Sequence, residues 1–279
     1  MIIKGREIAN SIRMRIADDV SDLGFTPKVA LLQVGSHPAI DSFVSIKKKI
    51  AGLVGIELVK VSFDEGVTTE DLLQEIDLLS RSEDANGKKL YHGLIVQLPL
   101  PDNIDVDTVL NAVPRDLDID VLSQEAQDNM YEDGVLPPVA GAVREVLRKT
   151  RTDLRENKVA VIGTGRLVGA PVIKWLEAQG IEPIVVNKQT GDLKQALSEA
   201  QVIISGVGQP GLITKDMVNE KHVLIDAGTS ESGGVVRGDV DPGCAEVVKA
   251  MTPVPGGVGP ITVAVLFQNL LGRLQLDSE

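Results

Sequence analysis

A lysine and a glutamine have the side-chain types and positions that acid–base chemistry needs. The stretch SFVSIKKK places Phe43 and Lys47 four residues apart, on one face of a helix. The stretch GLIVQLPLP places Gln97 at the end of an apolar run, before a rigid Pro-Leu-Pro segment. A lysine at the mouth of an apolar cleft can have a lowered pKa and serve as an acid or a base. The residues alone favour a plainer interpretation, in which the three consecutive lysines form one solvated face.

Three aspartates alternate in the stretch DLDID, at Asp116, Asp118 and Asp120. They can bind the polar edge of a ring, form an acidic loop or supply half of a cation site. The three histidines of the chain, at positions 37, 92 and 222, are scattered and do not support a transition-metal site. We therefore assign no metal.

A loop rich in proline and glycine, TPVPGGVGP (252–260), directly precedes an apolar run. Glycine permits a positive φ and close approach of another group, whereas proline fixes φ. Because glycine has no side chain and proline donates no backbone hydrogen bond, we do not expect the loop to serve packing. It is either a tight connection between two elements or a wall against which a flat ligand lies.

A second glycine pattern, VIGTGRLVGAP, follows a run typical of a strand and opens a helical pattern. Gly163 allows a tight turn, Gly165 lets a pyrophosphate approach, and a helix that begins near Leu167 offers free N–H groups. Gly169 completes the pattern. The alternative is a tight strand-to-helix turn without a ligand.

The end of the next expected strand bears on the choice of cofactor. An NAD site often offers an acidic residue there to the ribose 2′-hydroxyl, but this chain has Asn187 and Lys188. Lys188 or Arg166 can pair with a 2′-phosphate, which favours NADP. Lys188 can equally be a solvated surface charge.

Two further loops follow expected strands, SGVGQPGLI (205–213) and DAGT (226–229). Ligands of parallel sheets bind beyond the carboxyl ends of the strands. Gly208 in the first loop and Thr229 in the second can therefore line the nicotinamide half of a pocket, or both loops can be simple turns.

Composition bounds the class of protein. The 279 residues suffice for one large or two modest domains, and the net charge of −12 argues against nucleic acid or an anionic membrane as the main partner. Cys244 is the only cysteine, so no internal disulfide can form. Without a long apolar span or a signal-peptide core, we expect a cytoplasmic protein.

Short runs rich in valine and isoleucine alternate with helical patterns, which predicts parallel sheets covered by helices. The second half of the chain has the βαβαβ order of a Rossmann-type unit. The expected strands are 28–34, 57–62, 93–98, 158–162, 183–186, 202–205 and 223–226. The expected helices are 39–54, 69–82, 106–112, 140–150, 167–179, 193–200 and 261–274.

Taken together, GLIVQLPLP, TPVPGGVGP and GDVD (238–241) resemble the FolD family of bifunctional methylenetetrahydrofolate dehydrogenase/cyclohydrolases. The resemblance covers essentially the whole chain. It implies an α/β protein of two domains with the active-site cleft between them. Residues 1–138 with 263–279 would form the catalytic, folate-binding domain, and 139–262 the Rossmann-type NAD(P)-binding domain.

The resemblance also implies an activity. Members of the family oxidise 5,10-methylenetetrahydrofolate with NADP and hydrolyse the methenyl product to 10-formyltetrahydrofolate. Tetrahydrofolate derivatives would be the ligands, and a homodimer the assembly. Two alternatives remain: a divergent member with dehydrogenase activity only, or a non-catalytic nucleotide-binding sensor of the same fold.

The family motifs transfer roles to individual residues. Lys47 looks like the catalytic lysine, Gln97 like the glutamine that contacts it, and Asp120 like the aspartate that holds the pterin. Phe43 stands where the family has tyrosine, and Val121 where it has glycine. The substrate-binding residues expected in the proline-glycine loop, beside the nicotinamide, are Pro255, Gly256 and Gly257.

The chain departs from the family in the nucleotide motif. Thr164 replaces an arginine, Gly165 a serine and Asn187 a histidine, while PPVA (137–140) replaces the family's P-C-T-P turn. Arg166 would substitute for the missing arginine, so NADP is expected, with NAD as the alternative. The expected cofactor-binding residues are Gly163, Thr164, Gly165, Arg166, Gly169, Asn187, Lys188, Gly208 and Thr229.

Overall fold

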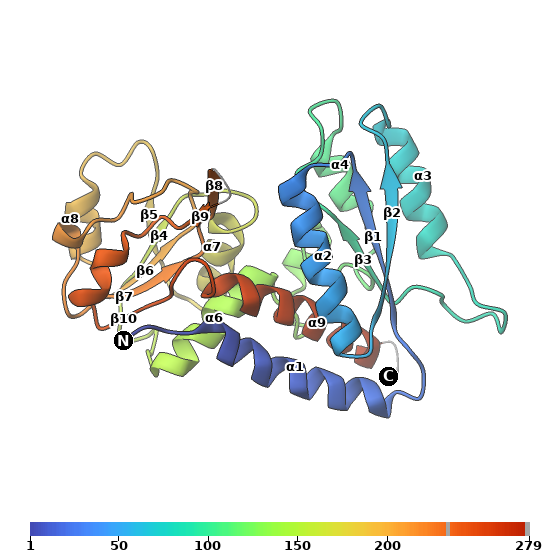
Figure 1. Ribbon diagram of the computed structural model, residues 1–279, viewed down its shortest axis with the longest axis horizontal. Helices are drawn as coiled ribbons and strands as arrows, with labels where there is room; N and C mark the ends of the chain where they lie inside the picture. Colours follow the sequence, from blue (N-terminus) through green and yellow to red (C-terminus); the bar gives the residue numbers. More distant parts are fainter. Residues whose placement is uncertain (233–234, 277–279) are drawn as a thin grey trace. The chain divides into compact units, whose positions relative to one another are not determined.

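The computed structural model describes residues 1–232 and 235–276, which divide into two compact units. The first unit comprises Ser11–Pro138 and the chain from Leu266 onward. The second unit comprises Met1–Asn10 and Val139–Val265. Both units are α/β structures built on parallel sheets, which confirms the predicted fold class (Figure 1).

The first unit contains a three-stranded parallel sheet of order β2-β1-β3. Its strands are β1 (Lys28–Val34), β2 (Glu57–Phe63) and β3 (Gly93–Val96). Its helices are α2 (Pro38–Leu53), α3 (Thr69–Ser80), α4 (Val106–Asn111) and α5 (Gln124–Asp128). Strand β3 ends two residues before its predicted end, so Gln97 lies just beyond the sheet.

Alternation of side chains across β1 explains why the first sheet is covered on both faces. Ala30 and Leu32 point into a core that includes Leu72 and Ile76 of α3. Leu31 points to the opposite face and is also fully buried. Every residue of β1 after Lys28 is buried, as expected for a central strand of a parallel sheet.

The second unit contains a five-stranded parallel sheet of order β10-β7-β6-β4-β5. Its strands are β4 (Val159–Ile162), β5 (Ile184–Val186), β6 (Val202–Ser205), β7 (Val223–Asp226) and β10 (Ala250–Met251), with a separate hairpin of β8 (Ser230–Ser232) and β9 (Val235–Arg237). Its helical segments are α6 (Pro138–Thr150), α7 (Gly169–Ala178), α8 (Leu193–Ser198), η1 (Lys215–Met217) and η2 (Pro242–Glu246).

The strand order of the second sheet contains a topological switch point. From β4 the chain proceeds to β5 on one side and then to β6 on the other. In doubly wound sheets, ligands bind beyond the carboxyl ends of the strands at such a point. The loops that follow β4 and β6 are therefore the natural nucleotide-binding segments of this unit.

Two helices contribute residues to both units, α1 (Gly5–Asp22) and α9 (Val258–Leu276). Helix α1 is not among the expected helices, although Ile12, Ile16 and Val20 recur at helical spacing and are buried. Helix α9 begins three residues before its predicted start, which places Pro260 in the first turn, where its missing N–H is not needed.

The first ten residues make their backbone contacts within the second unit. The Ile3 N–H donates to the Met251 carbonyl (2.8 Å), and the Met251 N–H donates to the Met1 carbonyl (2.9 Å). A Cβ on Gly5 would lie 1.7 Å from the Gly257 carbonyl oxygen. These contacts place the N-terminal segment beside β10, in the second unit.

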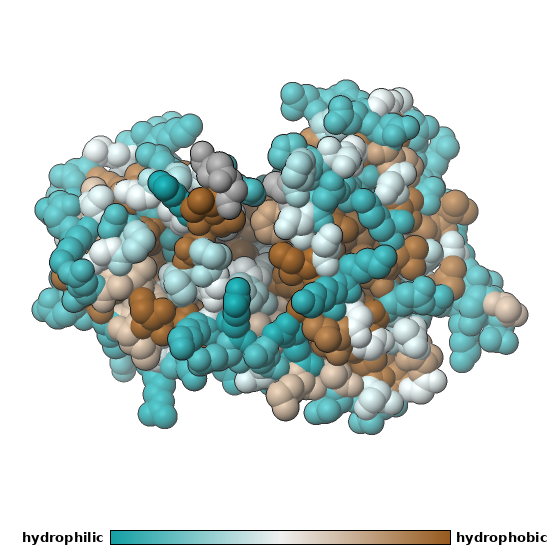
Figure 2. All heavy atoms as spheres, viewed as in Figure 1, coloured by the Kyte–Doolittle hydropathy of each residue, from teal (hydrophilic) through white to brown (hydrophobic). Residues whose placement is uncertain are grey.

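The face of the molecule shown in Figure 2 is covered mainly by hydrophilic side chains, with apolar residues scattered among them. None of the helices in the described part of the chain has both the length and the apolar character needed to cross a membrane.

Candidate active site

Lys47 and Gln97 meet in the first unit. Lys47 lies on α2, and its Nζ donates to Gln97 Oε1 at 3.1 Å. Gln97 is 8% exposed, and its Nε2 donates to the Leu98 carbonyl at 2.7 Å. The Gln97 amide is therefore held at both ends, and its oxygen faces the ammonium group.

Asp120 belongs to the same group of side chains. Burial raises the pKa of its carboxyl, and the positive charge of Lys47 opposes that effect. A lysine, an amide and a carboxyl with a raised pKa thus lie within electrostatic reach of one another. Such an arrangement can hold a polar ring edge and move a proton at one position.

The three aspartates of DLDID have three different surroundings. Asp116 is half-exposed and accepts a hydrogen bond from Lys89 Nζ at 2.6 Å. Asp118 is buried, and its Oδ2 accepts from the N–H groups of Leu122 (3.0 Å) and Ser123 (2.8 Å). Asp120 interacts with Lys47 and also with the neighbouring charge of Asp118, whereas Asp116 pairs with Lys89, so the three carboxylates of the pattern have different partners.

Helix α9 fixes the loop that carries Asp120. Asn269 Nδ2 donates to the carbonyls of Ile119 (2.9 Å) and Leu136 (2.8 Å). Val121 in this loop is fully buried and has φ of 54°. This left-handed conformation is unfavourable for a β-branched residue and is comfortable for the glycine found in the family motif.

Phe43 also lies on α2, one turn before Lys47, and 52% of its surface is exposed. An aromatic ring this accessible offers a flat apolar surface next to the lysine. It supplies no hydrogen-bond donor or acceptor.

The glycines of the turn after β4 have two different roles, one in packing and one next to a possible ligand. Gly163 has φ of 92°, and a Cβ on Gly169 would lie 2.0 Å from the Gly163 carbonyl oxygen, so both positions require glycine. A Cβ on Gly165 would meet no atom within 4 Å. Thr164, Gly165 and Arg166 are exposed at the switch point. Packing alone therefore does not explain Gly165, whereas approach of a phosphate does.

The loop after β5 is a tight turn in which Asn187 uses its own side chain. Asn187 Oδ1 accepts from the Gln189 N–H at 2.9 Å, and the Asn187 N–H donates to Thr190 Oγ1 at 3.0 Å. Lys188 is exposed at the tip of this turn. The Asn187 oxygen thus shapes the turn, and Lys188 is the residue there that can offer charge to a ligand.

The loops after β6 and β7 approach each other. Gly208 has φ of 73°, and a Cβ there would lie 3.3 Å from the Thr229 carbonyl oxygen. Both predicted cofactor residues therefore lie at the same carboxyl edge of the sheet as the glycine turn.

The proline-glycine loop after β10 corrects one expectation. A Cβ on Gly257 would lie 2.5 Å from the Pro253 carbonyl oxygen, so this glycine does serve close packing. Gly256 has φ of 99°, and a Cβ there would meet no atom within 4 Å; Pro255 beside it is exposed. Gly257 is thus needed for packing, whereas Pro255 and Gly256 present an accessible surface.

Two family models match the chain. The catalytic domain of tetrahydrofolate dehydrogenase/cyclohydrolase matches residues 3–120, and its NAD(P)-binding domain matches residues 137–277. The chain belongs to the tetrahydrofolate dehydrogenase/cyclohydrolase family. The resemblance found from the sequence motifs is thereby confirmed.

Relatives of this family cover nearly the whole chain. The bifunctional protein FolD of Staphylococcus haemolyticus is 35% identical over 277 residues, covering 97% of this chain and 95% of that protein. The crystal structure of the bifunctional enzyme FolD of Campylobacter jejuni is similar, with a TM-score of 0.91, 28% identity and 99% of both chains covered. The Trypanosoma brucei FolD structure, complexed with NADP cofactor and an inhibitor, has a TM-score of 0.91 and 28% identity, covering 100% of this chain and 98% of that one.

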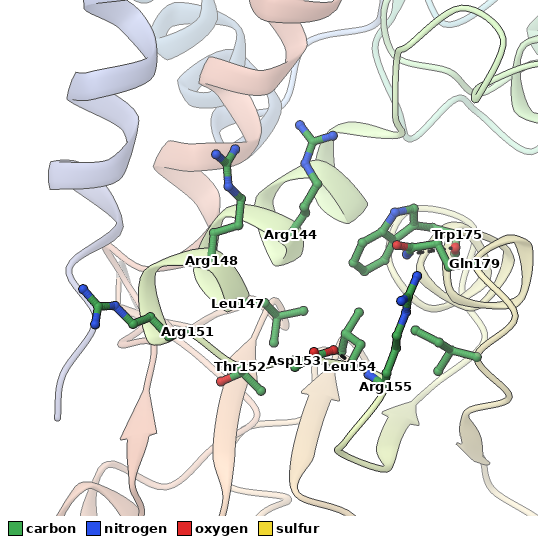
Figure 3. A pocket seen from close by; sticks show the side chains of 11 residues that line it. Arg144, Leu147, Arg148, Arg151, Thr152, Asp153, Leu154, Arg155, Trp175 and Gln179 are labelled. Carbon is green, nitrogen blue, oxygen red and sulfur yellow. Dashed lines mark hydrogen bonds between the residues drawn. The ribbon is translucent and has the colours of Figure 1, made fainter.

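One hollow in the second unit lies away from the family's glycine motifs. It has a volume of about 540 Å³ and is lined by residues of α6, of 151–155 and of the end of α7. These segments lead into β4 and β5, so the hollow lies at the amino ends of these strands. Figure 3 shows the guanidinium groups of Arg148, Arg151 and Arg155 lying apart from one another. The arginines do not converge on one anion.

Sequence reasoning missed two buried carboxylates of the second unit, Asp226 and Asp239. Both stand in stretches that the motif analysis quoted, DAGT and GDVD, but neither received a role. Two features of the sequence could have identified them. Asp226 stands directly at the end of an apolar strand, and glycines lie close to the aspartate in both stretches. Their contacts are described below.

Replacement of Asp118 by asparagine tests the cost of burying this charge. Burial raises the pKa of Asp118 from 3.8 to about 6. The folded-state pKa of Asp118 exceeds the unfolded value. The contribution of its protonated carboxyl to the free energy of unfolding is therefore fully present below about pH 4, and it is lost as the pH rises through about 6. The oxygen of asparagine can still accept from Leu122 and Ser123.

We therefore expect Asp118→Asn to raise the free energy of unfolding at pH 7.5 by up to about 3 kcal/mol and to change it little at pH 4. Urea denaturation of both proteins at the two pH values measures this. A loss of stability at pH 7.5 would show that the charge of Asp118 supports the loop, and an equal loss at both pH values would show that its carboxyl geometry does so independently of charge.

Proposed function

We propose that this chain oxidises 5,10-methylenetetrahydrofolate to the methenyl form with NADP and hydrolyses that product to 10-formyltetrahydrofolate. Family membership over both domains supports the reaction class. The observation that carries the proposal is the 3.1 Å hydrogen bond between Lys47 and Gln97, within electrostatic reach of Asp120. A protein that only bound nucleotide would not need these three side chains together in the other unit.

In this proposal Lys47 is the catalytic acid–base residue. Its ammonium group is oriented by Gln97 Oε1, which leaves the remaining N–H bonds for substrate or water. Gln97 accepts a hydrogen bond from the lysine and also positions it, because the Gln97 amide is itself anchored to the Leu98 carbonyl. Hydrolysis needs a proton to leave the attacking water and a proton to reach the departing nitrogen. Lys47 can transfer these protons as a general base and acid.

Asp120 would hold the pterin through the N–H donors at its polar edge. Burial raises the pKa of this carboxyl, and the positive charge of Lys47 opposes that effect. The exposed ring of Phe43 would stack on the flat pterin. Pro255, Gly256 and Gly257 would border the substrate next to the cofactor, and the predicted cleft between the two domains stays a prediction.

The residues at the carboxyl edge of the second sheet fit a dinucleotide. Gly163, Thr164, Gly165 and Gly169 form a turn at the switch point with room above Gly165, and Arg166 and Lys188 are exposed cations suited to a 2′-phosphate. Asn187, Gly208 and Thr229 would complete the site. NADP held by these residues would supply the hydride acceptor for the oxidation.

The alternative of a dehydrogenase without efficient hydrolase activity is favoured by one residue, Phe43. A tyrosine hydroxyl at this position could hydrogen-bond the lysine and order water, and Phe43 cannot. We also propose, from the family resemblance, that the protein is a cytoplasmic homodimer. Monitoring NADPH absorbance with NADP and methylenetetrahydrofolate distinguishes either enzyme from a non-catalytic sensor.

Replacement of Lys47 by methionine tests the catalytic role. We expect Lys47→Met to fold normally, because the side chain is only partly buried, and to lose cyclohydrolase activity by about 100-fold or more. The measurement is the decay of methenyltetrahydrofolate absorbance. Lys48→Met, an exposed neighbour on the same helix, is the matched control. Hydrolysis at the normal rate by Lys47→Met would refute the assignment.

Arg166 should determine the preference for NADP. We expect Arg166→Ala to raise KM for NADP about tenfold, the loss of one charge-assisted contact, and to change KM for NAD little. Steady-state kinetics with both cofactors gives the comparison, and Lys188→Ala shows whether the second cation shares the role. Equal effects on NADP and NAD would mean that Arg166 does not contact the 2′-phosphate.

Phe43→Tyr tests the balance between the two steps. Hydride transfer depends mainly on holding the methylene carbon in position, whereas hydrolysis also needs proton transfers. We expect the added hydroxyl to raise the rate of hydrolysis relative to oxidation. The two rates are measured separately on the same protein preparation, and an unchanged ratio would contradict the argument.

A further inference from the structure

Two carboxylates that form no ion pair within the described part of the chain are buried at the carboxyl edge of the second sheet. Asp226 is 2% exposed and Asp239 is 0% exposed. Burial, with the charge of Asp239 adding to it, raises the pKa of Asp226 to about 6. The hydrogen bonds that both carboxylates accept come from backbone N–H groups and from one hydroxyl.

Asp239 anchors the loop that follows β6. Its Oδ2 accepts from Ser205 Oγ at 2.6 Å and from the Val207 N–H at 2.8 Å. Its Oδ1 accepts from the Gln209 N–H at 2.7 Å. The two amides lie on either side of Gly208, so this glycine is fixed between two anchored residues.

Asp226 in turn anchors the segment that carries Asp239. It accepts from the N–H groups of Asp239 (3.2 Å), Val240 (2.9 Å) and Gly228 (3.0 Å). Its own N–H donates to Thr252 Oγ1 at 2.8 Å, at the start of the proline-glycine loop. The loops after β6, β7 and β10 are thus connected through one pair of side chains.

Glycines provide the space for the two carboxylates. A Cβ on Gly228 would lie 2.2 Å from Asp239 Cγ, and a Cβ on Gly238 would lie 2.0 Å from Asp226 Oδ2. The pair is therefore built into the packing of this edge.

Stability alone does not account for the pair. A buried charge that lacks a cation costs free energy, and a buried like charge nearby increases that cost. What the two carboxylates supply is six acceptor contacts to loop groups that the strand ladders cannot satisfy. Their benefit is a fixed loop geometry.

We propose that Asp239, held in place by Asp226, is a positioning residue of the dinucleotide site. It fixes the backbone from Val207 to Gln209 next to the glycine turn, where a Cβ on Gly163 would lie 3.4 Å from the Gly206 carbonyl oxygen. The cofactor then binds to an edge that is already ordered, which avoids the entropy cost of ordering the loop on binding. This inference rests on the proposed binding of NADP at that edge.

The decisive variant is Asp239→Asn. Asparagine has the same shape, but one acceptor oxygen becomes an NH₂ group that faces an N–H donor. Asp241→Asn is the matched control, because Asp241 is an exposed carboxylate on the same segment, where it accepts from the Gly243 N–H at 2.7 Å.

Two measurements are made on each protein. Amide hydrogen exchange of residues 205–211 is followed without nucleotide, and the Kd for NADP is determined by calorimetric titration. For Asp239→Asn we expect faster exchange in this loop, a Kd at least about tenfold weaker, and a KM for methylenetetrahydrofolate within about twofold of the original. Asp241→Asn should change none of these.

Ser205→Ala is the second variant, which removes one hydroxyl donor and keeps both carboxylates, and it should weaken NADP binding by about threefold. It decides the question if Asp239→Asn does not fold. Unchanged NADP affinity in the variants, with the original protein binding NADP, would refute the inference alone. An original protein that binds no NADP would refute the proposed cofactor and this inference together.

Discussion

Loops at the carboxyl ends of parallel strands lose the backbone partners that the sheet supplies, and buried polar side chains must replace them. In the second unit Asp226 and Asp239 perform this task for three loops. In the first unit Gln97 and Asn269 do so, through the carbonyls of Leu98 and Ile119. The candidate site depends on this constraint, because the proposed ligand-binding residues lie on these loops or next to them.

The same side-chain type takes different roles according to its surroundings. Asp116 is half-exposed in a surface ion pair with Lys89, and Asp118 is buried as an acceptor for two backbone amides. Asp120 interacts with Lys47 and has a raised pKa. Local sequence cannot distinguish the three, because burial and charged neighbours come from elements far away in the chain.

Two residues that depart from the family pattern, Val121 and Phe43, change the backbone conformation or the chemistry available at the site. Val121 occupies a left-handed conformation with φ of 54°, where the family motif has glycine. A conformation unfavourable for valine is maintained by full burial of the side chain and by the contact of Asn269 to the carbonyl of Ile119, two residues earlier. Phe43 keeps an exposed ring beside the lysine and lacks the hydroxyl of tyrosine, so the departure changes the chemistry available without changing the surface offered to a flat ligand.

The sequence by itself determined strands β1–β7, most helices and the glycine turn, because apolar periodicity and the conformational freedom of glycine are local properties, whereas β8, β9 and β10 were not predicted. Strands 28–34, 202–205 and 223–226 were predicted at their observed bounds. Tertiary structure decided which unit contains Met1–Asn10, since only pairing with β10 places that segment. It also decided that Gly257 serves packing and that Asp226 and Asp239 form a pair, because each depends on atoms that are brought together from distant parts of the chain.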